Sequence, residues 1–350
     1  MKPNVNSIDV ANHAGVSQSA VSRVFTPGAP VSAAMRDKVM RSAASLGYHP
    51  NRLAGSLITH RSKLIGVVIG YLGNCFYPLA VERLCRRLRL AGYHTMMFFT
   101  EPGELADATV EAFLQYRVDG VILASVMICD TWVAACDQAG VPVVLFNRFW
   151  KDPRLAAITV DNEQGAGTVA EFLVAGGHRR IAYIAGMVGT AAQDEREAAF
   201  RKRLVELGVP LFDRAVGLFE ADPARGAARE LFDRPAEERP DAVFACNDQM
   251  ALALMDVVRH EFDLRVPEDV SVIGFDDVPQ AAWPSYKLTT VHQSVDRMVD
   301  GTIALLFERI EQPEREPRRV VMPVSLSVRE SARVPEGYGA ERLSASDALI

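Results

Sequence analysis

From residue 64 onward the sequence alternates short, continuous apolar runs with longer amphipathic segments, and no other feature restricts the fold as strongly. The run Leu64–Ile69 contains no polar side chain, so both faces of such a strand must be covered. This pattern is typical of a parallel sheet whose strands are joined by helices on both faces. The alternation restarts at Ile181–Ala185. We therefore expect an α/β body of two doubly wound parallel-sheet lobes in series.

The alternation also predicts approximate bounds for the elements. We expect strands at 64–69, 95–99, 120–124, 141–146, 181–185, 242–246 and 270–275, and helices near 79–91, 104–116 and 130–139. Doubly wound sheets bind ligands beyond the carboxyl ends of their strands. The residues that follow the expected strands are nearly all polar: Asn74 with Phe76, Ser125, Asn147 with Arg148, Asp161 with Asn162, Arg196, Asn247 with Asp248, and Asp276 with Asp277. A binding site is expected among these residues.

The first 62 residues follow a different pattern, that of short helices. Ser7 can cap a helix over 8–14, and Gly15 can adopt the left-handed conformation that ends it. Ser17 can cap a second helix, and a third is expected at about 33–46. Two short helices joined by a tight glycine turn form a helix-turn-helix, so we expect an all-α head.

The second helix of the head has one apolar face and one polar face. Its polar face carries side chains that are short or forked enough to hydrogen-bond base edges in DNA, namely Gln18, Ser19, Ser22 and Arg23. An ordinary helical bundle is the alternative interpretation. A solvated helix face would more often carry Glu and Lys, so the serine-rich face favours DNA binding.

The charge distribution also separates the head from the body. The whole chain has a net charge of −6, yet residues 1–62 carry seven Lys and Arg against two Asp, a net +5, and the remainder carries −11. A basic head on an acidic body is expected when one end of a protein meets a polyanion. On charge alone, a solvated surface is an equally good interpretation.

Several classes of protein are disfavoured by what the sequence contains. The five cysteines form no close pairs at ligand spacing, so we expect neither a disulfide framework nor a zinc site. No window approaches the roughly 20 apolar residues of a membrane span. Glycine pairs at 165 and 167 or 186 and 189 are only fragments of a nucleotide loop. We therefore expect a reduced, cytoplasmic protein that is not an enzyme and has no metal or cofactor.

A series of motifs in fixed order identifies a resemblance for the head: Asp9-Val10-Ala11, Ala14-Gly15-Val16-Ser17, Val21-Ser22-Arg23-Val24, Val31-Ser32, Leu46-Gly47-Tyr48 and Pro50-Asn51-Arg52. These resemble the DNA-binding head of the LacI/GalR family of bacterial transcription regulators, with a lambda-repressor-like helix-turn-helix domain at 1–50 and a hinge helix and linker at 51–62. The resemblance implies that Gln18, Ser19 and Arg23 read bases in the major groove. It implies phosphate contacts for Ser17 and Ser22, and minor-groove contacts for the hinge residues Asn51, Ala54 and Leu57, of which Leu57 would wedge between base pairs.

Residues 63–334 resemble the same family, whose body is similar to periplasmic sugar-binding proteins. The matching stretches include Val160-Asp161-Asn162, Gly177-His178-Arg179-Arg180-Ile181 and Val266–Asp277. The resemblance implies a near lobe at about 63–160 and 292–321, a far lobe at about 161–291 and 322–334, and a tail at 335–350. It implies effector contacts by Arg196, Asn247 and Asp276 in the far lobe, and by Asn74, Phe76, Asn147 and Gln293 at the near lobe and cleft. Asp248 can be either a helix cap or an effector ligand.

The resemblance implies a sequence-specific DNA-binding regulator, expected to be a repressor. It would bind a palindromic operator as a homodimer and be controlled by a sugar or sugar derivative in the cleft between the lobes. An arginine fork equally suits a carboxylate or phosphate, so a sugar acid remains open. The alternative function, a solute-binding protein of a transporter, would need an N-terminal export signal in place of the basic head. The tail has no leucine heptad, so a dimer is expected in place of a higher assembly.

Overall fold

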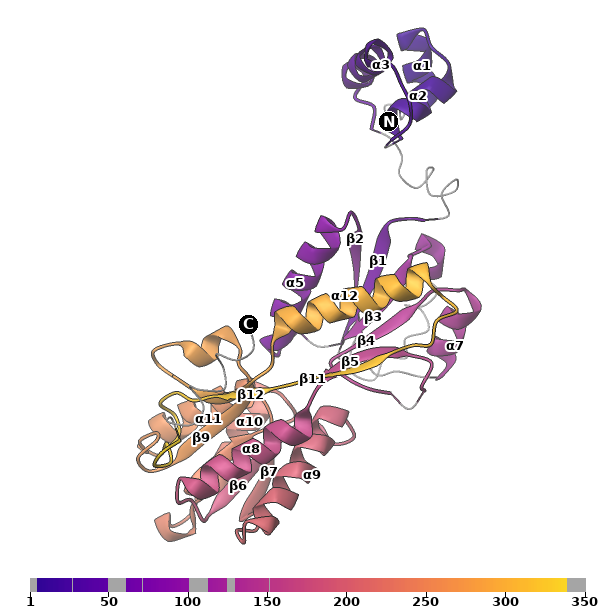
Figure 1. Cartoon of the computed structure of the whole chain (residues 1–350). Coiled ribbons are helices and arrows are strands. Elements are labelled where there is room, and N and C mark those ends of the chain that lie inside the picture. The colour runs from indigo at the N-terminus through magenta and orange to yellow at the C-terminus, as the bar shows by residue number, and fades with distance from the viewer. Residues whose placement is uncertain are drawn as a thin grey trace. The chain divides into compact units, whose positions relative to one another are not determined.

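The computed structural model describes residues 5–26, 28–49, 61–70, 72–100, 113–124, 130–150 and 152–338. The chain divides into two compact units, a head of residues 1–62 and a body of residues 63–350. Figure 1 shows the helices of the head and the sheets of the body. No helix among the described residues is long and apolar enough to cross a membrane.

The head consists of α1 (Ser7–Ala14), α2 (Gln18–Phe25) and α3 (Ala33–Leu46). Ser17 caps α2 as expected, by accepting a hydrogen bond from the backbone of Ala20. The cap of α1 was predicted wrongly, because Asn6 and not Ser7 begins it. Asn6 accepts from the backbone of the first turn while Asp9 accepts from the Asn6 N–H, so two unsatisfied donors are satisfied reciprocally.

A small apolar cluster holds the three head helices together. Its fully buried members come from all three helices: Val10, Ala11, Ala14, Val21, Val24, Val39 and Ala43. The ring of Tyr48, after α3, packs edge-on against Phe25 with centroids 5.7 Å apart. Because the apolar stripe of α2 faces this cluster, its polar face is left exposed to solvent.

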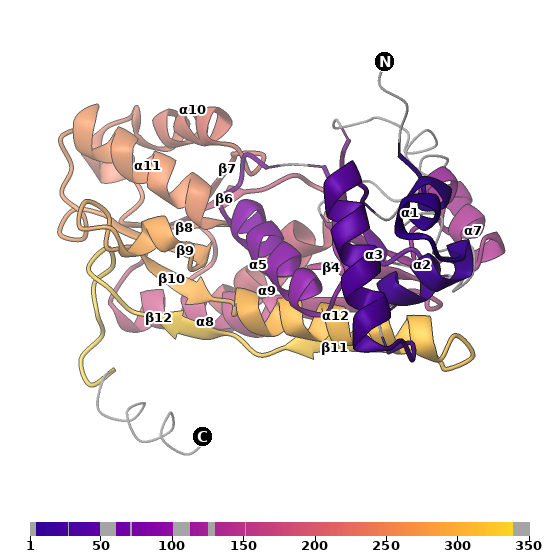
Figure 2. The same cartoon turned by 90° about the horizontal axis from the view of Figure 1, so that it is seen from above.

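The near lobe is a six-stranded sheet of order β11-β5-β4-β3-β1-β2. Its strands are β1 (Leu64–Ile69), β2 (His94–Phe99), β3 (Gly120–Ala124), β4 (Val143–Phe146), β5 (Ala156–Val160) and β11 (Arg319–Met322). Its helices are α5 (Phe76–Leu90), α7 (Asp130–Gln138) and α12 (Val295–Glu311). In Figure 2, α5 and α12 lie side by side over one face of the sheet. All its neighbouring strands are parallel, as the continuous apolar runs predicted.

The far lobe is a second six-stranded sheet, of order β12-β10-β9-β8-β6-β7. Its strands are β6 (Ile181–Ala185), β7 (Asp213–Val216), β8 (Ala242–Ala245), β9 (Ser271–Asp276), β10 (Thr289–His292) and β12 (Ser325–Ser327). Its helices are α8 (Asn162–Ala175), α9 (Ala191–Glu206), α10 (Ala221–Phe232) and α11 (Asp248–His260), with short 3₁₀ turns η1 (Ala236–Glu238) and η2 (Pro279–Ala282). Only the β10–β12 pair among these strands is antiparallel.

Three connections join the two lobes. The chain leaves β5 for α8 at Asp161, leaves β10 for α12 at 293–294, and leaves β11 for β12 at 323–324. The first connection is bonded to the end of β11, because the Asp161 N–H donates to the Met322 carbonyl at 2.9 Å. The polar residues at the carboxyl ends of the strands therefore lie beside the connections.

Two helix predictions differ from the structure. The helix expected near 79–91 starts earlier, at Phe76, because Pro78 fits in a first helical turn, where its missing N–H is not needed. The Phe76 N–H donates to Asn74 Oδ1 at 3.0 Å. Of the helix expected at 104–116, residues 113–116 are helical and the rest lies outside the described residues.

Gly274 in the middle of β9 allows a close approach between the strand and α11. A methyl group there would overlap Asp248 Oδ1 and meet the Leu288 side chain at 3.0 Å. We expect Gly274→Ala to lower the free energy of unfolding by about 1–3 kcal/mol through overpacking. Gly226→Ala is the matched control, because Gly226 is an exposed residue of α10 with no atom within 4 Å of the added carbon; it should be neutral or stabilising by up to about 1 kcal/mol. Urea unfolding of both variants checks this, and equal effects would contradict it.

Candidate functional site

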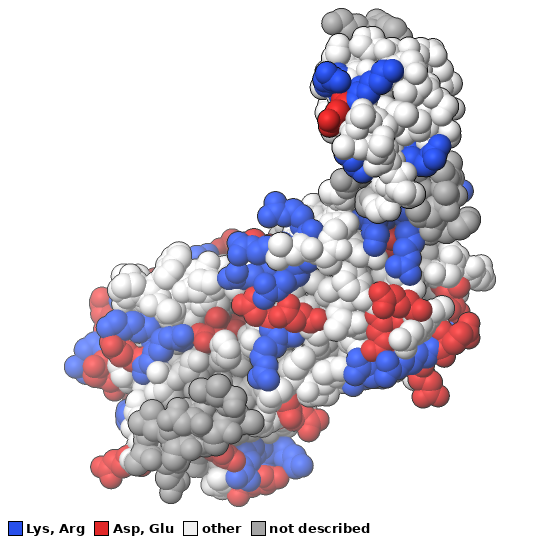
Figure 3. All heavy atoms as spheres, turned by 45° about the horizontal axis from the view of Figure 1, so that its top comes forward, with Lys and Arg blue, Asp and Glu red and all other residues white. Residues whose placement is uncertain are grey.

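The polar face of α2 is the candidate DNA-reading surface. Ser17, Gln18, Ser19, Ser22 and Arg23 are all exposed. Gln18 Nε2 donates to Ser7 Oγ at 3.0 Å, and the Ser17 and Ser19 hydroxyls are 2.9 Å apart. On the face of the head visible in Figure 3, basic side chains predominate over acidic ones. The predicted hinge residues Asn51, Ala54 and Leu57 lie outside the described residues.

In the body, Arg196 is the centre of a buried polar cluster. It lies in the second turn of α9 with a side chain that is only 2% exposed. Its Nε donates to Asn162 Oδ1 at 2.8 Å, and its Nη1 donates to the Cys246 carbonyl at 2.6 Å. The guanidinium lies over the Phe275 ring at 3.5 Å from the centroid, a favourable cation–π geometry. These contacts fix both the position and the plane of the guanidinium.

Asp276, the last residue of β9, faces this arginine. Its Oδ1 lies 3.8 Å from Arg196 Nη1 and accepts from Gln293 Nε2 at 2.6 Å. Burial raises the pKa of Asp276 well above its usual range, while Arg196 and the side chains of Asn74 and Gln293 favour the charged form. The structure thus brings together four of the predicted residues: Asn74 of the near lobe, Arg196 and Asp276 of the far lobe, and Gln293 of the second connection.

Within the described residues, three buried polar atoms around this cluster have no hydrogen-bond partner. They are Asp276 Oδ2, Gln293 Oε1 and Asn247 Nδ2. Asn247 caps α11 through its other amide atom, which accepts from the Met250 N–H at 3.0 Å. Buried polar groups are ordinarily hydrogen-bonded, so two acceptors and one donor left over at adjacent strand ends indicate a place for a polar ligand.

Asp248 is engaged inside the far lobe. Asn247 and not Asp248 is the cap of α11. The fully buried carboxylate of Asp248 accepts from the Val278 N–H at 2.9 Å and from the Thr290 hydroxyl. Burial raises the pKa of Asp248 to about 7. Both oxygens thus serve the packing of α11 against β9 and β10.

The raised pKa of Asp248 predicts a pH dependence of stability. A carboxyl whose folded-state pKa exceeds its unfolded value contributes stability that is complete below the unfolded value and is lost as the pH rises through the folded value, here between about 4 and about 7. The raised pKa of Asp276 likewise makes the folded protein less stable as the pH rises. We expect Asp248→Asn to reduce the fall in melting temperature between pH 5 and pH 8, since the Thr290 hydroxyl can accept from the new amide. Asp222→Asn, at an exposed side chain, is the control. An unchanged slope in Asp248→Asn would contradict the prediction.

Three of the predicted effector contacts belong to the near lobe: Asn74, Phe76 and Asn147. Asn74 is 6% exposed and Phe76 is 1% exposed. The Phe76 ring stacks on Phe146 at 6.1 Å between centroids, within the core of the body. Asn147 follows β4 with a positive φ of 62° and is partly exposed. Phe76 therefore packs against the strand that Asn147 ends.

Three residues that contact Arg196 were not among the predicted effector contacts. Cys246 supplies a carbonyl, Phe275 supplies an aromatic face, and Asn162 accepts from the guanidinium. Cys246 and Phe275 directly precede the predicted Asn247 and Asp276. Their only signal in the sequence was this adjacency, because an apolar residue at a strand end is ordinarily core.

Known families and proteins match the chain over nearly its whole length. A model described as bacterial regulatory proteins of the lacI family matches residues 8–51, and a periplasmic binding protein-like domain matches residues 170–332. The HTH-type transcriptional regulator CelR of Thermobifida fusca is 35% identical over 331 residues, which cover 92% of this chain and 96% of CelR.

Solved structures of transcriptional regulators also match the chain over nearly its whole length. A complex of the transcriptional regulator CelR with cellobiose has a TM-score of 0.71 at 33% identity and covers 94% of this chain and 100% of that one. The lac repressor dimer bound to operator and the anti-inducer ONPF has a TM-score of 0.83 at 29% identity and covers 93% of this chain and 98% of that one. The head, the two-lobed body and these similarities agree, and the chain belongs to the LacI family of bacterial transcriptional regulators.

Proposed function

We propose that this regulator is a repressor that binds a palindromic operator as a homodimer and is controlled by a neutral sugar in the cleft between its lobes. Residues 1–50 would form the DNA-binding domain, 51–62 the hinge, 63–334 the effector-binding and dimerisation body, and 335–350 a tail. The operator lies in the cytoplasm, so we infer a cytoplasmic location. The lac repressor dimer bound to operator supports the DNA and dimer parts of the proposal.

One observation supports the effector class most strongly. Asp276 Oδ2 and Gln293 Oε1 are acceptors that receive no hydrogen bond from the part of the chain that the structure describes, and Asn247 Nδ2 is a donor that finds no acceptor there. Neighbouring hydroxyl groups of a sugar both donate and accept, so they can satisfy all three. We assign effector contacts to Asn74, Asn147, Arg196, Asn247, Asp276 and Gln293, with Phe76 as a wall. Asp248 would hold the site in shape from inside the far lobe.

The charge of the site favours a neutral ligand over an anionic one. Arg196 brings one positive charge, but the Asp276 carboxyl lies beside it and would repel a carboxylate or phosphate when ionised. Two Arg196 nitrogens are already bonded to protein oxygens. A sugar acid or sugar phosphate would therefore find the arginine fork largely occupied.

A thermal-shift screen tests the effector class. Cellobiose, D-glucose and D-ribose would be compared with glucuronate and glucose 6-phosphate, because a ligand at 100 times its Kd stabilises the folded protein by about 2.7 kcal/mol. We expect a neutral sugar to raise the melting temperature and the anions to have no effect. Binding of an anion alone would contradict the proposal. Operators selected from random DNA by the full chain would then be tested by gel shift with and without the stabilising sugar, which also excludes a pure solute-binding function.

Arg23 tests the reading surface of the head. Replacing an arginine that contacts a base costs about 1–3 kcal/mol and relaxes specificity at that base pair. We expect Arg23→Ala to weaken binding to the selected operator accordingly, with little change for a scrambled sequence. Arg41→Ala is the control, because Arg41 is exposed on α3 and its Nε bonds the Asp37 carbonyl of its own helix. Equal losses on operator and scrambled DNA would assign Arg23 to phosphate contact instead.

A further inference from the structure

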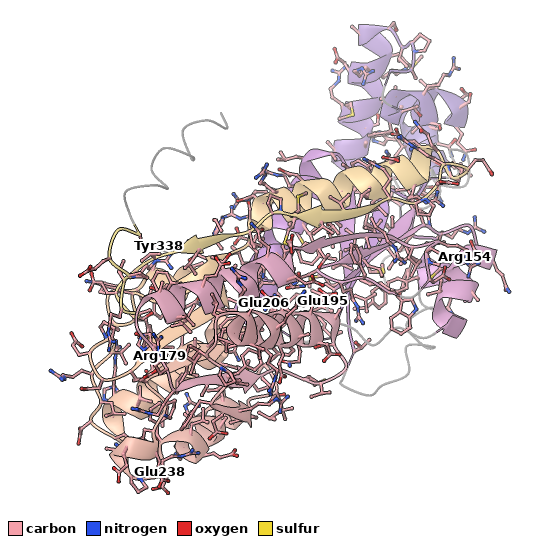
Figure 4. The ribbon with its side chains drawn as sticks, turned by 60° about the horizontal axis from the view of Figure 1, so that its bottom comes forward. Arg154, Arg179, Glu195, Glu206, Glu238 and Tyr338 are labelled. Atoms are coloured by element: carbon pink, nitrogen blue, oxygen red, sulfur yellow. The ribbon has the colours of Figure 1, made fainter. Side chains whose placement is uncertain are left out.

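Asn162 connects the buried arginine of the effector site to the first connection between the lobes. It is the first residue of α8, directly after Asp161, and is 3% exposed. Its Oδ1 accepts from Arg196 Nε at 2.8 Å, and its Nδ2 donates to Glu195 Oε2 at 2.7 Å. Figure 4 shows Glu195 at the end of α9 that lies toward the near lobe. The side-chain amide of Asn162 thus binds two neighbouring residues of α9, Glu195 through its NH₂ group and Arg196 through its oxygen.

The chemistry of the partners fixes the orientation of this amide. The Arg196 guanidinium can only donate, and the ionised Glu195 carboxylate can only accept. Flipping the amide would place the NH₂ group against the guanidinium and the carbonyl against the carboxylate, which would lose both hydrogen bonds. At 3% exposure, water has little access to replace them. The direction of the Arg196 Nε–H therefore follows the backbone position of Asn162.

The other two connections are bonded to the same strand end. Gln293, in the second connection, donates to Asp276 at 2.6 Å. The Ser327 hydroxyl, just beyond the third connection, donates to Asp277 Oδ2 at 3.0 Å. Asp276 and Asp277 both have positive φ angles, of 131° and 57°, which non-glycine residues adopt only when their surroundings hold them. Thus Gln293 within the second connection, and Asn162 and Ser327 on the elements that follow the first and third, are bonded to the Arg196–Asp276 pair or to its neighbour.

We propose that Asn162 is a positioning residue that couples the effector site to the movement of the lobes. It contacts no effector. It makes the orientation of Arg196 depend on the first connection, so that a change in lobe angle and a change at the guanidinium occur together. The proposal rests on the proposed function in one respect, the contact of Arg196 with the effector. Coupling of this kind requires one element with two arrangements that both sites bias, and the proposal assigns that part to the first connection.

Variants of the amide test the proposal through its two hydrogen bonds. Asn162→Ala removes both bonds. Asn162→Asp keeps an acceptor for Arg196 but places a second carboxylate beside Glu195. The double variant Asn162→Asp with Glu195→Gln reverses the second bond, because the glutamine amide can donate to the aspartate. Glu163→Gln is the control, since it removes one negative charge from the exposed first turn of α8.

The first measurement needs no ligand. The full chain with ¹⁵N-labelled arginine gives an Nε–H signal for Arg196, assigned by its absence in Arg196→Lys. We expect hydrogen exchange at this group to be about 10- to 100-fold faster in Asn162→Ala, the factor for losing one hydrogen bond to a charged group. The double variant should restore slow exchange, and Asn162→Asp alone should not restore it fully. Unchanged exchange in Asn162→Ala, or no restoration in the double variant, overturns the proposal.

The second measurement uses cellobiose and the selected operator. We expect Asn162→Ala to bring the ratio of operator affinities with and without cellobiose close to one, and the double variant to restore the wild-type ratio. Recovery of the Nε–H signal without recovery of cellobiose affinity would show that Asn162 contacts the sugar, and would overturn the proposal. If the wild-type protein binds no sugar of the screen, the proposed effector class fails, and the exchange measurement still decides the role of Asn162.

Discussion

Arg196→Lys is expected to abolish the effector response, with a loss of effector affinity of at least about 100-fold, or roughly 2.7 kcal/mol. Lysine keeps the charge but lacks the fork that bonds Asn162 and the Cys246 carbonyl, and the flat face that stacks on Phe275. Its compact ammonium cannot bridge these groups while presenting a donor to the ligand. Calorimetric titration with the sugar that stabilises the wild-type protein measures the loss.

Arg196→Ala should lower protein stability more than Arg196→Lys does, because it leaves Asp276 buried without its counter-charge. Breaking a buried ion pair costs about 3–5 kcal/mol of stability, so this variant should also unfold at lower temperature. Arg203→Lys is the matched control on the same helix, since the Arg203 side chain is 38% exposed and pairs with Glu171 and Glu206. An unchanged effector affinity in Arg196→Lys would show that the site lies elsewhere.

Removal of residues 1–62 is expected to eliminate specific operator binding while leaving effector binding within about two-fold, well under the 1.4 kcal/mol of a ten-fold change. The body forms its own compact unit from Lys63 onward, with a buried core from both lobes. The head has a separate core from Val10 to Ala43. The melting temperature and the sugar titration of residues 63–350, compared with the full chain, check the body. Gel shift with the selected operator checks DNA binding.

The outcome for the truncated chain separates two assignments. If residues 63–350 retain specific operator binding, the DNA-reading surface is not α2 and the function of the head must be reassigned. If they lose both operator and sugar binding, the truncation has damaged the body, and the single substitution Arg23→Ala in the full chain becomes the decisive measurement. We expect neither outcome, because the described core residues of the body all lie beyond residue 63.

Local sequence patterns predicted most of the elements correctly. The seven predicted strands agree with β1, β2, β3, β4, β6, β8 and β9 to within about two residues, because apolar runs between polar segments are a local signal. No strand was predicted at β5, β7, β10, β11 or β12. The errors also have local causes. The start of α1 was assigned to Ser7 although Asn6 and Asp9 form a reciprocal cap, and the start of α5 was placed after Pro78 although proline is tolerated in a first turn.

The candidate site was predictable as a set of residues but not as an arrangement. Arg196, Asn247 and Asp276 could be named because polar residues at strand ends and a family resemblance both indicated them, and Gln293 could be named from the resemblance alone. Their pairing could not be named, since Arg196 and Gln293 are far apart in the sequence and on different elements. The role of Asp248 illustrates the limit: its position after a strand suited a cap or a ligand equally, and the fold gave it Val278 and Thr290 as partners.

The sequence by itself determined the helical head, the two parallel sheets and the class of protein, because periodicity, capping residues and ordered motifs are properties of neighbouring residues. Only the tertiary structure decided which polar atoms are left without partners, how Arg196 is held flat on Phe275, and that Asn162 binds it to the first connection. Those features depend on contacts between residues more than 30 positions apart in the sequence. Such contacts arise when the sheets close and bury the groups together, where each unsatisfied polar atom carries a large free-energy cost.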